Sequence, residues 1–218
     1  MSLFRNRQQA GQQLARQLAE HEPGDDAIVL GLARGGVPVA AEVARILGLE
    51  LDVFVVRKLG VPVQPELAFG ALATGGARVL NERIISVAGL DDHVIDKITD
   101  AEREILEYRE QLYRGDKAPP QLAERNVILV DDGVATGATM SVAVEAARQL
   151  HPTRIIGAVP VSPVRSCRSL AEEVDAMVCI ATPEPFMGVG AWYDDFHQVD
   201  DDEVRAALGT DGSRPNAP

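Results

Sequence analysis

The feature that most constrains the fold is a repeated alternation of short apolar runs with segments of helical periodicity. The apolar runs are residues 27–32, 51–56, 126–131, 154–160 and 174–180. Strands that alternate with helices in this way predict a doubly wound α/β fold, with a mainly parallel, five-stranded, Rossmann-like sheet. Aromatic residues make up only 4% of the chain, which favours a core of Val, Ile, Leu and Ala. Such sheets bind ligands beyond the carboxyl ends of their strands, so we look there for chemistry.

Composition excludes several classes of protein. The net charge of −12 over 218 residues argues against a nucleic-acid binder, which needs a basic face. The polar N-terminus lacks the apolar run of a signal peptide, and no later stretch is long enough to span a bilayer, so no membrane association is expected. Cys167 and Cys179 form no metal-ligand pattern, and we expect reduced structural thiols in a cytoplasmic protein.

The spacing predicts one domain over residues 1–208. Its core covers about 22–181, and a small hood covers about 182–208 together with an N-terminal helix at 5–21. Residues 209–218 have the composition of a disordered tail. Nothing in the chain decides between a monomer and a homodimer.

The segment after the third apolar run carries the strongest signal. Asp131 and Asp132 follow the run directly, and a helix is expected from Thr139. Between them lies a small-residue turn: Gly133, Val134, Ala135, Thr136, Gly137, Ala138 and Thr139. Backbone N–H groups in such a turn at a helix N-terminus bind phosphate, whereas paired carboxylates suit vicinal hydroxyls or hydrated Mg²⁺. The combination predicts a ribose 5-phosphate site, and the desolvation cost of two unpartnered acids weighs against a plain structural turn.

This segment resembles the motif that binds 5-phosphoribosyl 1-pyrophosphate (PRPP) in type I phosphoribosyltransferases, and the resemblance spans about residues 27–196. It implies Mg²⁺-dependent transfer of the phosphoribosyl group from PRPP to a nitrogenous base, with release of pyrophosphate. It assigns the ribose hydroxyls to Asp131 and Asp132 and the 5′-phosphate to residues 133–139. The resemblance also makes Asp131 a candidate ligand of the metal.

Two cationic segments follow the first two apolar runs. In the family, Ala33, Arg34 and Gly35 would form the pyrophosphate loop, and we predict a cis peptide bond between Ala33 and Arg34. An Arg-Gly-Gly sequence alone is equally typical of a simple turn. Arg57 and Lys58 open a Gly- and Pro-rich segment to Gly76, which we interpret as a flexible catalytic loop leading into a hairpin, although two solvated cations are the usual interpretation. The resemblance implies that Arg57 and Lys58 reach the pyrophosphate, and it gives Arg34 and Lys58 the neutralisation of the leaving group.

The clustered aromatics near the C-terminus are similar to the hood of 6-oxopurine phosphoribosyltransferases. That similarity implies base contacts from Phe186, Val189 and Trp192, with Asp194 near the metal through water. The aromatics could equally cover a core edge. The family's lysine before the hood is absent from residues 159–163, so the acceptor base is left open.

Two other functions compete with catalysis. A non-catalytic regulator could use the same site to sense PRPP, and a scaffolding protein could retain the fold without the chemistry. The intact phosphate turn and the cations favour an enzyme. No protein base stands out, because none of the four histidines lies in a motif.

Overall fold

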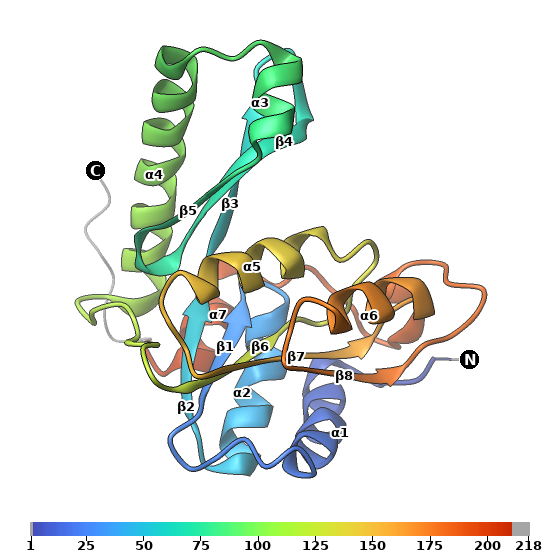
Figure 1. Ribbon diagram of the computed structural model, residues 1–218. Coiled ribbons are helices and arrows are strands. Elements are labelled where there is room, and N and C mark those ends of the chain that lie inside the picture. The colour runs from blue at the N-terminus through green and yellow to red at the C-terminus, as the bar shows by residue number, and fades with distance from the viewer. Residues whose placement is uncertain (1, 211–218) are drawn as a thin grey trace.

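The structure is a computed structural model that describes residues 2–210. Its centre is a five-stranded parallel sheet in the order β2-β1-β6-β7-β8 (Figure 1). The strands are β1 (Ile28–Leu32), β2 (Glu50–Phe54), β6 (Asn126–Val130), β7 (Arg154–Val161) and β8 (Ala176–Ala181). Leu30 pairs with Leu129 across the central strands, and both side chains are fully buried. The predicted doubly wound sheet is therefore confirmed.

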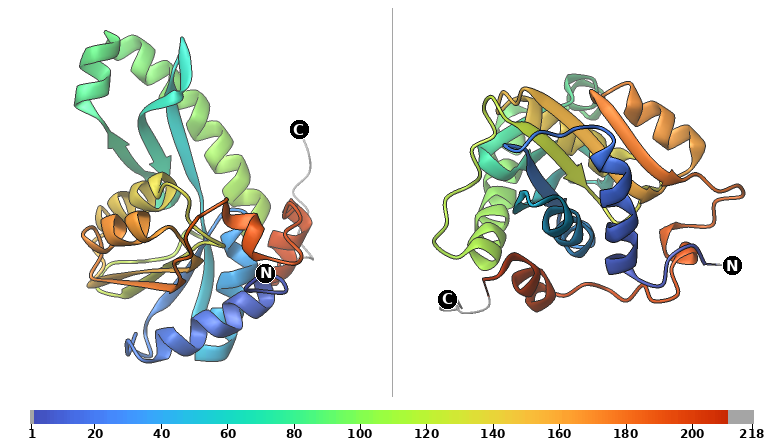
Figure 2. Two further views of the ribbon diagram at one scale, coloured as in Figure 1. Left: turned by 90° about the vertical axis from the view of Figure 1, so that its right-hand side faces the viewer. Right: turned by 90° about the horizontal axis from the view of Figure 1, so that it is seen from below.

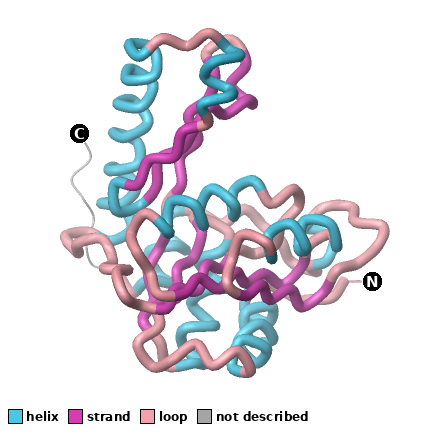
Figure 3. Tube along the Cα trace, in the orientation of Figure 1, coloured by secondary structure: helices cyan, strands magenta, loops and turns pink. Residues whose placement is uncertain are grey.

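Helices cover both faces of this sheet, as Figures 1 and 3 show. On one face lie α1 (Arg7–Ala19) and α2 (Gly36–Leu47), and on the other lie α5 (Ala138–Arg148) and α6 (Val164–Ala171). Alternating residues of one strand serve the two cores, since Val29 packs towards α1 and α2 while Leu30 packs towards α5. In the described chain, no helix has the length and apolar character needed to cross a membrane.

A second unit projects from the sheet as an arm (Figures 1 and 2). It consists of an antiparallel sheet with two helices, and a short 3-10 turn lies at its base. Its elements are β3 (Val56–Val61), β4 (Gln64–Ala73), η1 (Thr74–Gly76), β5 (Ala77–Leu80), α3 (Glu82–Ala88) and α4 (Asp92–Arg114). The long loop predicted from Arg57 is thus wrong, because this segment forms the hairpin itself. Leu59 and Phe69 of the hairpin pack with Leu106 of α4 in one apolar cluster, which favours strands over an open loop.

The N-terminal residues of the described chain pair with the hood. Phe4 forms a parallel bridge with Tyr193, and the backbone N–H groups of Leu3 and Phe4 both donate to the carbonyl of Trp192. The hood contains η2 (Val189–Trp192) and ends in α7 (Asp201–Leu208). Of the predicted tail, residues 211–218 lie outside the described chain. Gly209 instead caps α7 and Thr210 is buried, so these two residues belong to the folded unit.

The two cysteines differ from the expectation of reduced thiols. Cys167 on α6 and Cys179 on β8 form a disulfide, with their Cα atoms 6.7 Å apart. Their separation of 12 residues spans a helix that folds back on the following strand, which brings the two side chains together. Sequence spacing alone did not reveal this packing.

Candidate active site

The two acids stand at the carboxyl edge of the central strand β6. The Oδ1 atom of Asp131 accepts a hydrogen bond of 2.9 Å from the backbone N–H of Asp132. Burial, reinforced by the charge of Asp132, raises the pKa of Asp131 well above its usual range. Burial also raises the pKa of Asp132, and the neighbouring Arg7 guanidinium opposes that rise. Burial therefore favours the protonated form of both carboxyl groups, and Arg7 favours the charged form of Asp132.

The pyrophosphate loop lies directly against these acids. The peptide bond between Ala33 and Arg34 is cis, as predicted. A Cβ atom at Gly35 would lie 2.2 Å from Oδ2 of Asp132, and one at Gly36 would lie 2.4 Å from the carbonyl oxygen of Val130. Only residues without a side chain allow this close approach. The two glycines thus bring the loop into contact with the end of β6.

The predicted phosphate turn wraps the start of α5. Gly137 adopts φ 90° at the N-cap, a conformation that favours glycine. A hydrogen bond of 2.7 Å from the Ser166 hydroxyl to the Ala135 carbonyl supports the turn from α6. Residues 133–140 and Asp131 surround a hollow of about 150 Å³. A small hollow at a helix N-terminus is suited to an anion the size of phosphate.

A larger cavity of about 580 Å³ adjoins this hollow and shares Asp131 and Thr139 with it. Its lining comes from four separate parts of the chain: Arg7, Leu32, Ala33, Arg34, Gly35, Asp131, Asp132, Thr139, Val189, Phe196, His197, Gln198 and Val199. The structure therefore brings together the predicted acids, the phosphate turn, the pyrophosphate loop and Val189. Val189 also closes over the turn, since a Cβ atom at Gly133 would lie 2.4 Å from its Cγ1 atom.

The predicted lid cations lie elsewhere. Both belong to β3 of the arm, and neither lines the cavity. Arg57 forms an ion pair with Glu102 of α4, with its Nη2 atom 2.6 Å from the carboxylate. Lys58 is exposed. In this conformation of the arm the two cations are not part of the site.

The hood aromatics are also arranged differently from the prediction. Phe186 and Trp192 pack on each other, with ring centroids 6.5 Å apart, inside the apolar cluster of the hood. Neither of them lines the cavity, whereas Phe196 does. Asp194 is likewise absent from the lining, and its carboxylate accepts a hydrogen bond from the Ser2 hydroxyl. The two aromatic side chains thus contact each other, and Asp194 contacts Ser2, instead of lining the cavity.

Sequence reasoning missed Arg7 and Tyr193. Arg7 donates to Asp132 from both Nε and Nη2 at 2.8 Å, and the Tyr193 hydroxyl donates to the carbonyl of Asp132 at 2.5 Å. Burial raises the pKa of Tyr193, so this hydroxyl keeps its proton. Arg7 and Asp132 are 125 residues apart, and no local pattern connects them.

Sequence reasoning also missed Asp201 and His197. The carboxylate of Asp201 lies 3.6 Å from Arg34 and accepts a hydrogen bond of 2.6 Å from Tyr113, which connects the pyrophosphate loop with α4. His197 lies 2.7 Å from Glu203 and 3.1 Å from Asp195. These acids raise its pKa, chiefly through the hydrogen bond with Glu203.

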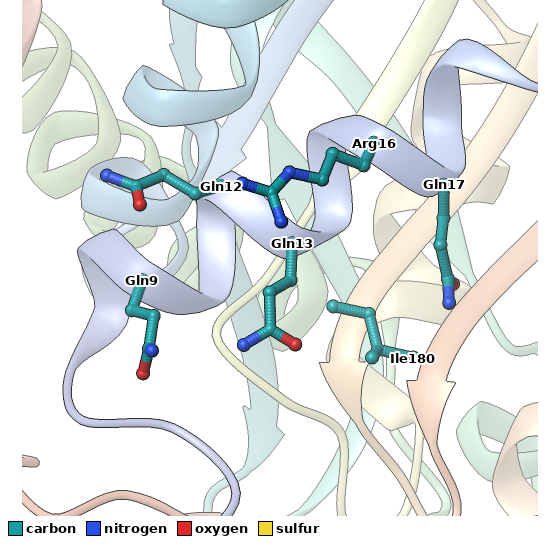
Figure 4. A pocket seen from close by; sticks show the side chains of 6 residues that line it. All are labelled: Gln9, Gln12, Gln13, Arg16, Gln17 and Ile180. Carbon is teal, nitrogen blue, oxygen red and sulfur yellow. The ribbon is translucent and has the colours of Figure 1, made fainter.

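A separate hollow of about 350 Å³ lies on the outer face of α1, between this helix and Ile180 of β8. Figure 4 shows that its wall consists mainly of glutamine side chains, with Arg16 as the charged member. Neither Arg7 nor the acids take part in it. This hollow is therefore unrelated to the acid-lined cavity.

Comparisons with known proteins identify the family of the chain. The family model described as "Phosphoribosyl transferase domain" matches residues 3–184. The chain belongs to this family. The phosphoribosyltransferase domain therefore includes the acids, the phosphate turn and the pyrophosphate loop, while most of the hood lies beyond the match.

Individual relatives match nearly all of this chain. The chain is 45% identical over 208 residues to a Mycobacterium tuberculosis protein named "Putative phosphoribosyl transferase", which matches 95% of this chain and 47% of the relative. The chain thus spans about half the length of the curated relatives it matches. The crystal structure of the Thermus thermophilus protein TT1426 has 41% sequence identity and a TM-score of 0.84, over 95% of this chain and 98% of that one. The overall fold is therefore shared with a solved structure.

Proposed function

We propose that the protein transfers the 5-phosphoribosyl group from PRPP to a nitrogenous base and releases pyrophosphate. One observation carries this proposal: the paired acids stand between a phosphate-sized hollow and a larger cavity bordered by the pyrophosphate loop. A sugar with a phosphate at one end and a pyrophosphate at the other matches that order of groups. The family match supports transfer of a phosphoribosyl group, whereas the identity of the base rests on experiment.

The residues have distinct proposed roles in the displacement. The turn at 133–139 binds the 5′-phosphate, and Asp131 and Asp132 accept hydrogen bonds from the ribose hydroxyls. A nitrogen of the base forms a bond to C1′ as the bond from C1′ to the pyrophosphate oxygen breaks. Arg34 and the backbone of the neighbouring loop neutralise the departing pyrophosphate. Catalysis then comes from positioning and from charge neutralisation.

The donor set fits Mg²⁺ delivered with the substrate. Among the described residues, no group of three or more His, Cys, Asp or Glu side chains is arranged to hold a metal by itself. Mg²⁺ commonly uses one or two carboxylates together with substrate phosphates and water, and Asp131 supplies such a carboxylate on the cavity wall. When bound, Mg²⁺ would neutralise charge on the leaving group. Asp194 could take part only if the hood moved, because it lies outside the lining.

Arg57 and Lys58 take part in this proposal only if the arm moves. Arg57 and Lys58 would reach the pyrophosphate only if the arm folded over the cavity, which requires release of the Arg57–Glu102 ion pair. Closure of this kind would also exclude water, which competes with the base as a nucleophile. The base contacts proposed for Phe186 and Trp192 require a similar rearrangement, whereas Val189 already lines the cavity. Nucleotide salvage and a cytoplasmic setting remain part of the proposal.

The test is a base panel. The protein is incubated with PRPP, Mg²⁺ and each of a series of nucleobases, and pyrophosphate release is measured. Release with one base identifies the acceptor, and Asp132→Asn should reduce it while the protein remains folded. PRPP binding without turnover by any base would instead indicate a PRPP-sensing regulator. Absence of PRPP binding by the unmodified protein would refute the assigned site.

A further inference from the structure

Arg7 reaches the site from a helix that is far away in sequence from the PRPP motif. It is the first residue of α1, and its side chain is buried. Its Nε and Nη2 atoms donate to the same oxygen of Asp132, each at 2.8 Å, and its Nη1 atom donates to the carbonyl of His197 at 2.8 Å. The guanidinium carbon lies 4.0 Å from the centroid of the Phe196 ring. Three partners from two other segments thus fix one guanidinium group.

The helix that carries Arg7 is itself rigidly placed. The side chain of Asn6 caps α1 by accepting a hydrogen bond of 2.9 Å from the backbone N–H of Gln9. A Cβ atom at Gly11 would lie 2.6 Å from the carbonyl oxygen of Val39, so α1 and α2 pack with their backbones close together. Arg7 therefore projects from a defined backbone position rather than from a mobile terminus.

The Arg7–Asp132 contact involves only one of the two carboxylate oxygens of Asp132. Arg7 takes Oδ2, which also faces Gly35, whereas no side chain among residues 2–210 donates a hydrogen bond to Oδ1. Two donors on one oxygen restrict rotation of the carboxylate, because a forked guanidinium contact is directional. The Oδ1 atom is then held in one orientation, on a residue that lines the cavity.

We propose that Arg7 is a positioning residue that holds Asp132 so that its free oxygen receives a ribose hydroxyl. This inference rests on the proposed function and deepens it, because it makes the N-terminal helix part of the sugar site. Arg7 acts through Asp132 and touches no reacting atom. Its loss should weaken recognition of the hydroxyls more than recognition of the phosphate.

The experiment measures binding of two sugar phosphates by calorimetry. Ribose 5-phosphate presents the hydroxyls, and 2,3-dideoxyribose 5-phosphate lacks both, so the ratio of their dissociation constants isolates hydroxyl recognition. A charge-assisted hydrogen bond corresponds to a ratio of about 10- to 100-fold in the unmodified protein. Arg7→Met should reduce that ratio by about 10-fold, leaving the part that Asp131 contributes. Arg7→Lys should give an intermediate ratio, since lysine keeps the charge but loses the fork.

Arg16→Met is the matched control. Arg16 lies on the same helix but on its outer face, as Figure 4 shows, and we expect the ratio of the unmodified protein. A cycle with Asp132→Asn completes the test, because Arg7→Met should lower the ratio no further once Asp132 has been changed. If Arg7→Met does not fold, Arg7→Lys and the cycle built on it decide the question.

The outcomes separate this inference from the proposed function. An unchanged ratio in Arg7→Met or Arg7→Lys, with ribose 5-phosphate still bound by the unmodified protein, would overturn the role of Arg7 alone. Equal weakening of both sugars would assign Arg7 a purely structural role and would also overturn it. If the unmodified protein binds neither sugar, the sugar site itself is wrong and both proposals fall.

Discussion

Replacing Gly35 with alanine tests the contact between the pyrophosphate loop and the acids. Gly35 has φ −59° and ψ −33°, which alanine adopts without strain, so any penalty must come from packing. The new methyl carbon would lie 2.2 Å from Oδ2 of Asp132 and 2.8 Å from its Cγ atom. An ordinary nonbonded separation is about 3.5 Å, so the carboxylate or the loop must move by about 1 Å.

The magnitude follows from what restrains Asp132. Arg7 of α1 donates to the same oxygen of Asp132, and the Tyr193 hydroxyl donates to the backbone carbonyl of Asp132. The Asp132 carboxylate therefore has little room to move away from a new methyl group. Overpacking of this kind costs about 1–3 kcal/mol. At a compatible backbone position without a clash, the same substitution stabilises by about 0.4–1 kcal/mol through the unfolded chain. The two effects have opposite signs, which makes the result decisive.

The assay is urea unfolding of four proteins: the unmodified chain, Gly35→Ala, Asp132→Ala and the double variant. We expect Gly35→Ala to destabilise the unmodified chain but to be neutral or stabilising in the Asp132→Ala background. The difference between the two backgrounds is the coupling energy. PRPP binding by Gly35→Ala should weaken at least about tenfold, because the displaced carboxylate loses a hydrogen bond. Equal destabilisation in both backgrounds would refute the close contact.

Three further predictions concern groups around the site. Glu102→Gln should release Arg57 from its ion pair and lower the dissociation constant for pyrophosphate by up to about fivefold. The limit is about fivefold because part-exposed ion pairs contribute about 1 kcal/mol or less. Calorimetry that shows an unchanged or weaker affinity for pyrophosphate would contradict this. Burial raises the pKa of Tyr113 and Tyr193 in the folded protein, so these two hydroxyls lose their protons first in the unfolded chain. The free energy of unfolding should therefore fall as the pH rises above about 10, by about 1.4 kcal/mol per pH unit for each tyrosine. Urea unfolding between pH 9 and 11 checks the slope, which Tyr193→Phe should reduce; an unaltered slope would argue against it. Reducing the Cys167–Cys179 bond, which links residues 12 apart, should lower the free energy of unfolding by up to about 3 kcal/mol. Urea midpoints with and without dithiothreitol measure this loss, and alkylation of both thiols in the untreated native protein would disprove the bond.

The parts of the site that could be predicted are those encoded within a single strand–turn–helix unit. Asp131, Asp132 and the following turn occur together in the sequence, and their order along the chain is their order in space. The edge of a parallel sheet then gathers the ends of β1 and β6, which placed Arg34 near the acids. Local order and a known sheet rule were sufficient for these residues.

The remainder depends on contacts that the sequence does not express locally. Arg7 lies in a polar, amphipathic helix, where an arginine normally indicates solvent exposure, whereas its partners Asp132 and His197 come from the end of β6 and from the hood. Arg57 was correctly placed after β2 but not on a hairpin that projects from the body, because Gly and Pro residues in this segment resemble a loop. Phe186 and Trp192 were placed on the cavity from family resemblance, whereas packing against each other satisfies their apolar surface.

The pairing of Leu3 and Phe4 with the hood has a consequence for biosynthesis. The partner residue Trp192 emerges from the ribosome long after the first helix has been made. A nascent chain can assemble the parallel sheet up to β8 before Leu3 and Phe4 can pair with the hood. The hood side of the cavity, which includes Val189 and Phe196, is therefore completed last, so a chain that ends before the hood should have an incomplete site.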